Sequence, residues 1–230
     1  MDWREFAVQL ASTARELLAQ DSVDGTLRKV TESATRLIDG CEAAGILLLS
    51  KGRGAETLAP TEELVNRSDQ LQARVGEGPC FDAARTGHPV FRIRDMTDEG
   101  ARWPAYAPEA HALGIGSMMG FLLYTEDEDL GALNLYSRKA GTFTEVSETA
   151  GWTLASHAAV AFSSAREHAQ MERAVATRHV IGEAMGILMA NHDLSEKEAF
   201  DVLRRYSQEE NVKLRDVARR VCERGGLPAE

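Results

Sequence analysis

The chain has 230 residues, of which 43% are hydrophobic and 27% are charged, and its formal net charge is −10. This composition is typical of globular proteins, and the acidic balance argues against indiscriminate binding to nucleic acid or to acidic membranes. The longest apolar run, residues 43–49, is far shorter than the roughly 20 residues that a bilayer requires, and the charged start MDWREFAVQL is unlike a signal peptide.

Apolar patterning predicts an α+β fold in the first 140 residues. Residues 1–39 repeat apolar side chains at helical spacing, with a break at DSVDG. Five short runs have the composition or the alternation of strands: GILLLS, AETLAP, HPVFRIRDM, IGSMMGFLLYT and LGALNLYS. Between them, TEELVNRSDQLQARV is interpreted as a polar helix or a covering loop, and RWPAYAPEAHALG as a helix. We expect about five antiparallel strands flanked by helices.

A long helix is predicted next, because a period of 3.6 residues runs from Phe143 to Met189 without a proline. Its expected seam consists of Leu154, Ala158, Ala161, Ala165, His168, Glu172 and Val175. A continuous helix of this span would be roughly 70 Å long at about 1.5 Å per residue. It would therefore link two domains or pair with a copy of itself. Two helices with a bend near residues 166–170 are the alternative.

Two shorter helices are predicted after the long one. The sequence SEKE at 195–198 has the pattern of a capping box, in which Ser195 and Glu198 satisfy each other's backbone amides. Asn211 is the expected N-cap of the last helix, VKLRDVARRVCER, and Gly225 is expected to end it. The chain therefore closes with a small all-helical module.

This module resembles an ANTAR domain, the RNA-binding module of bacterial transcription antiterminators. The resemblance covers residues 176–221 and spans three predicted helices. Its matching residues are Arg178, Ile181, Ala184, Gly186, Leu188, Met189, Ser195, Glu198, Ala199, Phe200, Leu203, Ser207, Leu214, Val217 and Ala218. The chain departs from the family at Met185, where a lysine is often found, and this removes one possible phosphate contact.

The resemblance implies an RNA-binding face made of polar residues that lie off the apolar stripes. Lys and Arg hold phosphates in such readers, while aromatic rings and guanidinium planes stack on unpaired bases. The candidate RNA-binding residues are Arg178, Arg204, Arg205, Tyr206, Ser207, Lys213, Arg215, Arg219 and Arg220. For each cation, surface charge paired with Glu209, Glu210, Asp216 or Glu223 is the alternative. From residue 178 onward nine Lys/Arg face ten Asp/Glu, against 17 and 26 before it, so this region is the least acidic.

The segment RHVIGEAMGILM places two glycines one turn apart at the end of the long helix. A glycine in a helix interior costs up to about 1 kcal/mol relative to alanine. We interpret Gly182, Ala184 and Gly186 as helix-packing residues that let the long helix approach its two successors. A direct approach of the backbone to RNA is the alternative.

Residues 40–165 resemble a GAF domain, a sensory α+β module, in the version that often precedes ANTAR in actinobacteria. The resemblance is carried by GEGPCFDAARTGHPV, RWPAYAPEAHALGIGSMM and GALNLYSRKAGTFTE. It implies an antiparallel-sheet sensor for an unknown small-molecule signal, because some relatives bind cyclic nucleotides, bilins or haem and many have no known ligand. No cofactor is identifiable from the sequence.

Several residues of this region carry groups that can react or bind a metal. Cys80 follows GEGP at an expected helix start, a position that suits a redox switch or a chromophore anchor. An ordinary buried residue is the alternative, and it is favoured. His88, His111 and His157 lack the spacing of metal ligands. Trp103 and Trp152 are expected in the core. The scattered Cys41, Cys80 and Cys222 favour a reducing cytoplasm.

The sequence thus predicts a cytoplasmic, non-enzymatic, dimeric regulator. Its expected parts are an N-terminal helical segment (1–39), a GAF sensor (40–165), a linking coiled-coil helix (145–175) and an ANTAR domain (176–225). The family implies binding of paired hairpin loops in leader transcripts, which prevents terminator formation. A DNA-binding regulator is the alternative, because short helices joined by tight turns also suit helix-turn-helix recognition. An enzyme is disfavoured, because GxxxxGK[ST] and GxSxG patterns and a nucleophile–base pair are missing from the sequence.

Overall fold

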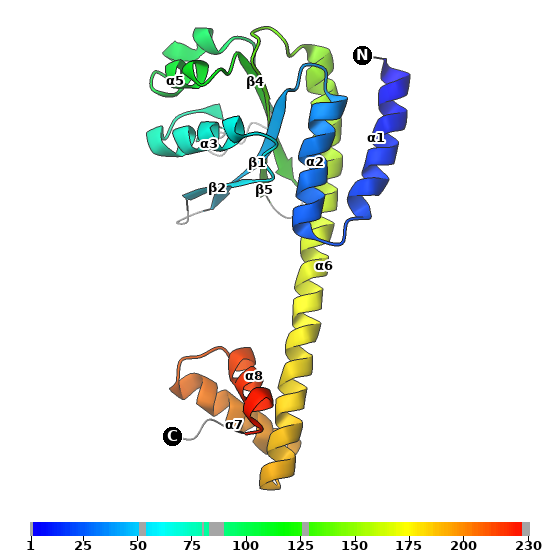
Figure 1. The fold of residues 1–230 in the computed structure, drawn as a ribbon, viewed down its shortest axis with the longest axis vertical. Coiled ribbons are helices and arrows are strands. Elements are labelled where there is room, and N and C mark those ends of the chain that lie inside the picture. Colours follow the sequence, from blue (N-terminus) through cyan, green and yellow to red (C-terminus); the bar gives the residue numbers. More distant parts are fainter. Residues whose placement is uncertain (1, 51–53, 80, 83–89, 126–128, 227–230) are drawn as a thin grey trace. The chain divides into compact units, whose positions relative to one another are not determined.

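The structure is a computed structural model that describes residues 2–50, 54–79, 81–82, 90–125 and 129–226. The chain forms two compact units, Met1–Arg166 and Glu167–Glu230. Helix α6 (Glu145–His192) is a single helix that contributes residues to both units, so the alternative with two separate helices is wrong (Figure 1). Among the described residues, no helix has both the length and the apolar character that a bilayer span needs.

The N-terminal unit is built on five antiparallel strands, as the sequence predicts, and the structure gives their order as β2-β1-β5-β4-β3. The strands are β1 (Ala43–Ser50), β2 (Gly54–Leu58), β3 (Val90–Ile93), β4 (Ser117–Tyr124) and β5 (Asp129–Ser137). In this register Ile46 lies between Leu58 and Leu133 on its two neighbouring strands. The inner strands β1, β5 and β4 are rich in apolar residues, which fits a sheet whose two faces are both covered.

Helices cover both faces of this sheet (Figure 1). On one side lie α1 (Trp3–Leu18), α2 (Val23–Leu37) and the beginning of α6. On the other lie α3 (Glu63–Val75), the 3₁₀ helix η1 (Met96–Ala101) and α5 (Tyr106–Ala112). The segment expected as a helix or a covering loop is therefore helix α3.

Each face of the sheet carries its own apolar core. On the α2 side, Leu154, Ala158 and Ala161 of α6 are 0%, 0% and 3% exposed and pack in the same cluster as Val30 and Leu135. The expected helix-pairing seam is therefore wrong over its first half. An apolar stripe with the helical period can pack against a sheet as well as against a second helix. Here the first half of the stripe packs against the sheet.

The C-terminal unit contains the end of α6, α7 (Glu196–Glu209) and α8 (Leu214–Arg224) (Figure 1). Its fully buried core is small and consists of Ala184, Leu188, Ala199, Leu203, Val217, Ala218 and Val221. Three of these seven side chains are alanines, so the three helices pack closely and leave most polar side chains on the surface.

Candidate nucleic-acid interface

The turn between α6 and α7 is fixed by the predicted capping box. The amide of Ser195 donates to the Glu198 carboxylate at 2.9 Å, and the amide of Glu198 donates to Ser195 Oγ at 3.4 Å. The Ser195 hydroxyl also donates to the Glu198 carboxylate at 2.6 Å, and this hydrogen bond, followed by the one from the Ser195 amide, holds the pKa of Glu198 below its ordinary value. Asp193, just before the box, has φ 52°, a left-handed conformation that Asp tolerates. Helix α7 therefore begins at a defined residue, which places its polar face.

The turn between α7 and α8 differs from the prediction. Asn211 is not the N-cap: it has φ 52° in the turn, and Lys213 precedes α8 without a side-chain capping bond. The Ser207 hydroxyl donates to the carbonyl of Val212 at 2.6 Å, and the amide of Val212 donates to the carbonyl of Ser207 at 3.0 Å. Ser207 thus closes this turn, and its contribution to RNA binding stays a prediction.

The two glycines of α6 do not serve the packing of this unit. Ala184 is fully buried, but Gly182 and Gly186 are exposed, and a Cβ added at either would meet no atom within 4 Å. Gly151 in the same helix shows the opposite case, because its Cβ would collide with the ring of Phe121. The packing interpretation therefore holds for Ala184 alone and is wrong for both glycines within one copy of the chain.

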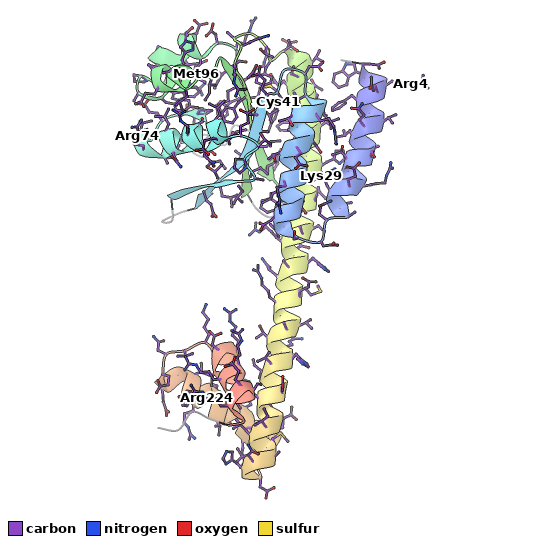
Figure 2. All side chains as sticks on the ribbon, in the orientation of Figure 1. Arg4, Lys29, Cys41, Arg74, Met96 and Arg224 are labelled. Atoms are coloured by element: carbon purple, nitrogen blue, oxygen red, sulfur yellow. The ribbon has the colours of Figure 1, made fainter. Side chains whose placement is uncertain are left out.

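The seven predicted cations all lie on the surface of the C-terminal unit, whose side chains Figure 2 draws as sticks. Three of them have acidic neighbours: Arg204 lies 2.9 Å from Asp201, while Arg215 and Arg219 lie 3.6 and 3.9 Å from Asp216. These arginine side chains are half or more exposed, and such surface pairs contribute only about 0–1 kcal/mol. They can therefore exchange their carboxylate for a phosphate.

The remaining four predicted cations have no ion pair among the residues that the structure describes. They are Arg178, Arg205, Lys213 and Arg220. On α8 the arginines form two rows one turn long, Arg215 with Arg219 and Arg220 with Arg224. Sequence reasoning missed Arg224, although its position four residues after Arg220 was the available signal. Its exposed side chain extends the second row (Figure 2).

The aromatic residue that is best exposed in this unit is Phe200, not the predicted Tyr206. Tyr206 is half-buried and packs against the small core. Phe200 is 39% exposed on α7, and Arg204 follows it by four residues on the same face. The available signal was its place beside Ala199, off the apolar stripe. Phe200 and Arg204 offer the two flat groups that can stack on unpaired bases.

Within the described residues of the N-terminal unit, no comparable arrangement of ligating groups is found. Cys80 and His88 lie outside the described residues, and within those residues no three His, Cys, Asp or Glu side chains form a metal-binding group. Trp103 is 2% exposed, and its Nε1 donates to Asp82 Oδ2 at 3.2 Å, so it is a core residue as predicted. Trp152 is half-buried.

The two described cysteines are poor nucleophiles. Burial raises the pKa of the Cys41 thiol to about 12, and its Sγ donates to the carbonyl of Ala43 at 3.4 Å. Burial, followed by the charge of Glu183, also raises the pKa of Cys222. Both thiols therefore stay protonated at neutral pH, which makes them unreactive.

One buried carboxyl group lies on the α3 side of the sheet. Asp69 is 2% exposed and accepts hydrogen bonds from Thr57 Oγ1 at 2.8 Å and from the Tyr136 hydroxyl at 3.2 Å. Burial raises its pKa from 3.8 to about 6, although the two hydrogen bonds act in the opposite direction. Through these two hydrogen bonds Asp69 connects α3 to β2 and β5 in the N-terminal unit.

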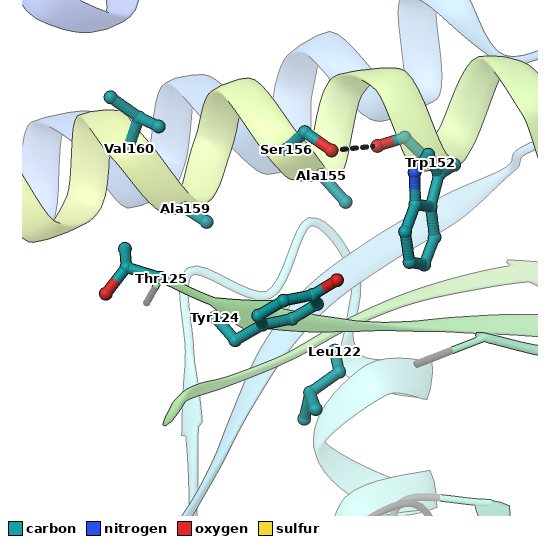
Figure 3. A pocket seen from close by; sticks show the side chains of 8 residues that line it. All are labelled: Leu122, Tyr124, Thr125, Trp152, Ala155, Ser156, Ala159 and Val160. Carbon is teal, nitrogen blue, oxygen red and sulfur yellow. Dashed lines mark hydrogen bonds between the residues drawn. The ribbon is translucent and has the colours of Figure 1, made fainter. Parts of the chain in front are cut away.

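An open apolar groove of about 400 Å³ lies between the end of β4 and α6 (Figure 3). The side chains that line it are Leu122, Tyr124, Thr125, Trp152, Ala155, Ser156, Ala159 and Val160. The rings of Tyr124 and Trp152 meet edge to face at 6.5 Å, and Ser156 Oγ donates to the carbonyl of Trp152 at 3.0 Å. The groove thus lies on the face of the sheet that α2 and α6 cover, opposite the face with Asp69.

Comparison with known families decides the identity of both units. Residues 20–163 match the GAF domain family, and residues 169–221 match the ANTAR domain family. The chain is a GAF–ANTAR protein. No curated protein sequence matches it. The ANTAR match covers the end of α6, α7 and most of α8, and Met185, at the position where lysine is often found, packs partly buried against the ANTAR core.

Solved structures share the fold of the GAF unit. The GAF domain of a phosphoenolpyruvate-protein phosphotransferase from Coxiella burnetii has a TM-score of 0.56 and 19% identity, over 74% of this chain and 99% of that one. The chromophore-binding domain of a bacteriophytochrome from R. palustris has a TM-score of 0.55 and 12% identity, over 72% and 62%. The phytochrome photosensory core of Stigmatella aurantiaca gives 0.60 and 11%, over 86% and 44%. The GAF–ANTAR chain thus spans less than two thirds of these phytochromes, and the similarity concerns the fold alone.

Proposed function

We propose that this GAF–ANTAR protein is an RNA-binding transcription antiterminator that responds to a signal received by its GAF domain. The observation that carries the proposal is the exposed set of cations on the ANTAR unit. Four of them lack an ion pair within the described part of the chain, and three hold only exposed pairs. A folded module gains nothing in stability from such a set, whereas a phosphate backbone binds to it.

The geometry supports different roles for these residues, some binding phosphates and others stacking on bases. Six of the seven predicted cations are arginines, whose planar guanidinium groups bind phosphates in a bidentate manner and stack on bases. Lys213, Arg219 and Arg220 are assigned to phosphates at the beginning and along the outer side of α8. Phe200 and Arg204 on α7 are assigned to unpaired loop bases, because single-stranded RNA exposes flat faces that duplexes hide.

Bivalent binding compensates for the weakness of a single module. The ANTAR unit is small, with seven fully buried residues, and its Lys and Arg are nearly balanced by Asp and Glu. Both features suit a modest affinity for one hairpin. Two modules in one dimer, on two adjacent hairpins, convert the second binding event into an intramolecular one and raise the overall affinity without new contacts. Paired hairpin loops held in this way keep the competing terminator hairpin from forming.

The proposal is tested with leader RNAs recovered by crosslinking the protein in cells. A gel shift compares one such RNA carrying two hairpins with the same RNA cut to a single hairpin, and duplex DNA serves as competitor. We expect the two-hairpin RNA to bind at least tenfold more tightly and the DNA to compete poorly. Equal affinity for one and two hairpins contradicts the bivalent mechanism, and effective competition by DNA favours a DNA-binding regulator.

A further inference from the structure

One face of α6 remains uncovered in the ANTAR unit. Met171 and Val175 are 68% and 62% exposed, His168 and His179 are exposed, and Gly182 and Gly186 face open space. We name these six residues the second-copy face. Helices α7 and α8 pack on the other side of α6, where Ala184 and Leu188 are fully buried (Figure 1).

The second-copy face follows an 11-residue repeat. His168 and His179 are 11 residues apart, as are Met171 and Gly182, and Val175 and Gly186. The same spacing extends back in the sequence to His157, Val160 and Ser164. An 11-residue repeat corresponds to about 3.67 residues per turn, so it follows one side of a nearly straight α-helix. No Asp, Glu, Lys or Arg occurs at these positions.

The two glycines need a partner that one copy of the chain does not supply. Each glycine costs up to about 1 kcal/mol of helix stability, and the open space at both positions shows that no contact inside the unit explains the cost. When two identical helices pair in parallel, every residue on the contact face meets its own copy near the two-fold axis. Glycines at the point of closest approach prevent this clash, while wider side chains fill the space where the helices diverge.

From these observations we infer that the second-copy face pairs with the same face of a second chain, parallel and in register, with the closest approach at Gly182 and Gly186. The inference rests on the proposed function, because bivalent RNA binding needs a dimer. It adds which surface forms the dimer, and it gives the two glycines their role.

Charges at the border of the face fit this partner. Arg178 and Glu183 flank the face on opposite sides of α6. In a parallel pair, a residue on one border lies opposite the residue five positions later on the other border of the partner. Each Arg178 therefore meets Glu183 of the other chain, and in the dimer Arg178 is no longer among the cations left for RNA. The equivalent border pair one repeat earlier is Glu167 and Glu172, which have like charges. Within one chain, Glu172 lies 3.3 Å from His168 Nε2. The attraction is therefore concentrated beside the glycines.

Cysteine crosslinking without RNA tests the face and the register. In Val175→Cys, two copies of the new thiol face each other across the two-fold axis, whereas the exposed thiol of the neighbouring Ala176→Cys lies about 100° around the helix from this axis. The native cysteines are the same in both variants, and the unsubstituted chain gives the background. We expect a short bismaleimide to give a covalent dimer with V175C at several times the yield of A176C. Equal yields, or a dimer in which V175C does not crosslink, overturn the inference.

The double variant Gly182→Leu with Gly186→Leu tests the role of the glycines. A Cβ at either position meets no atom within 4 Å in the single unit, so the variant is expected to keep its helical content, as measured by circular dichroism. The dimer measured by light scattering should convert to monomer at concentrations where the wild type is a dimer. A variant that keeps its helical content and stays a dimer contradicts the inference. A wild-type chain that dimerises through this face but binds no leader RNA refutes the proposed function alone.

Discussion

The buried carboxyl group of Asp69 gives the GAF unit a pH-dependent stability that one substitution should remove. Its pKa in the folded protein is about 6, against an ordinary value of 3.8, because burial disfavours the charged form. At about 1.36 kcal/mol per pKa unit, ionised Asp69 costs the folded state about 3 kcal/mol. In Asp69→Asn the amide can donate to Thr57 and accept from Tyr136, so both hydrogen bonds can be retained.

The direction in which the stability changes with pH depends on whether the folded or the unfolded state binds the proton of Asp69 more tightly. The folded pKa of Asp69 lies above the unfolded one, so the folded state binds more protons between about pH 3.8 and pH 6. The stability of the wild type therefore falls as the pH rises through this window and stays low above it. Asp69→Asn lacks the titration. The difference in unfolding free energy between variant and wild type should grow by about 1.5 kcal/mol from pH 5 to pH 7.5.

Urea unfolding followed by tryptophan fluorescence measures this difference. The three tryptophans, Trp3, Trp103 and Trp152, all belong to the N-terminal unit, so the signal reports the GAF domain. Asp98→Asn removes the same charge from an exposed position and serves as the matched control, measured at the same pH values. A difference between Asp69→Asn and wild type that does not change with pH would refute the reasoning, because Asp69 would then titrate alike in both states.

Three further outcomes are expected. Gly151→Ala should lower the stability of the GAF unit by about 1–3 kcal/mol, because its methyl group collides with the Phe121 ring, and a melting curve within 1 °C of the wild type would contradict this. Ser195→Ala should destabilise the ANTAR unit by about 1 kcal/mol and speed amide hydrogen exchange in the first turn of α7, while unchanged exchange there would argue against the capping box. Arg220→Ala should weaken RNA binding and reduce the slope of log K against log salt by about 0.7–0.9 for the lost phosphate contact, and Arg28→Ala, exposed in the GAF unit, should leave both unchanged.

Local signals in the sequence predicted the elements well. Alternating and continuous apolar runs predicted the five strands, and the spacing of Ser195 and Glu198 predicted the capping box. These features depend on residues close together in the chain. The family resemblance, spread over three helices and over the GAF segment, predicted the order of the two domains.

The errors concern which partner a helix face meets. Leu154 and Gly182 lie on faces of the same helix, yet the first is buried against the sheet and the second is exposed, and periodicity does not distinguish these cases. Asp69 was not singled out, because its burial depends on Thr57 and Tyr136, which are 12 and 67 residues away in the chain. The sequence indicates Tyr206 as the stacking ring, but packing decides which ring is exposed, and in this unit it is Phe200.

The most direct test of RNA binding by the ANTAR cations is crosslinking in cells followed by sequencing of the attached RNA. The wild type is compared with a triple variant, Lys213→Ala, Arg219→Ala and Arg220→Ala, which removes exposed side chains outside the buried core. We predict that the wild type recovers leader transcripts with paired hairpins and that the triple variant loses at least nine tenths of them. Recovery of the same transcripts in the same yield by both proteins would contradict the assignment of this surface to RNA.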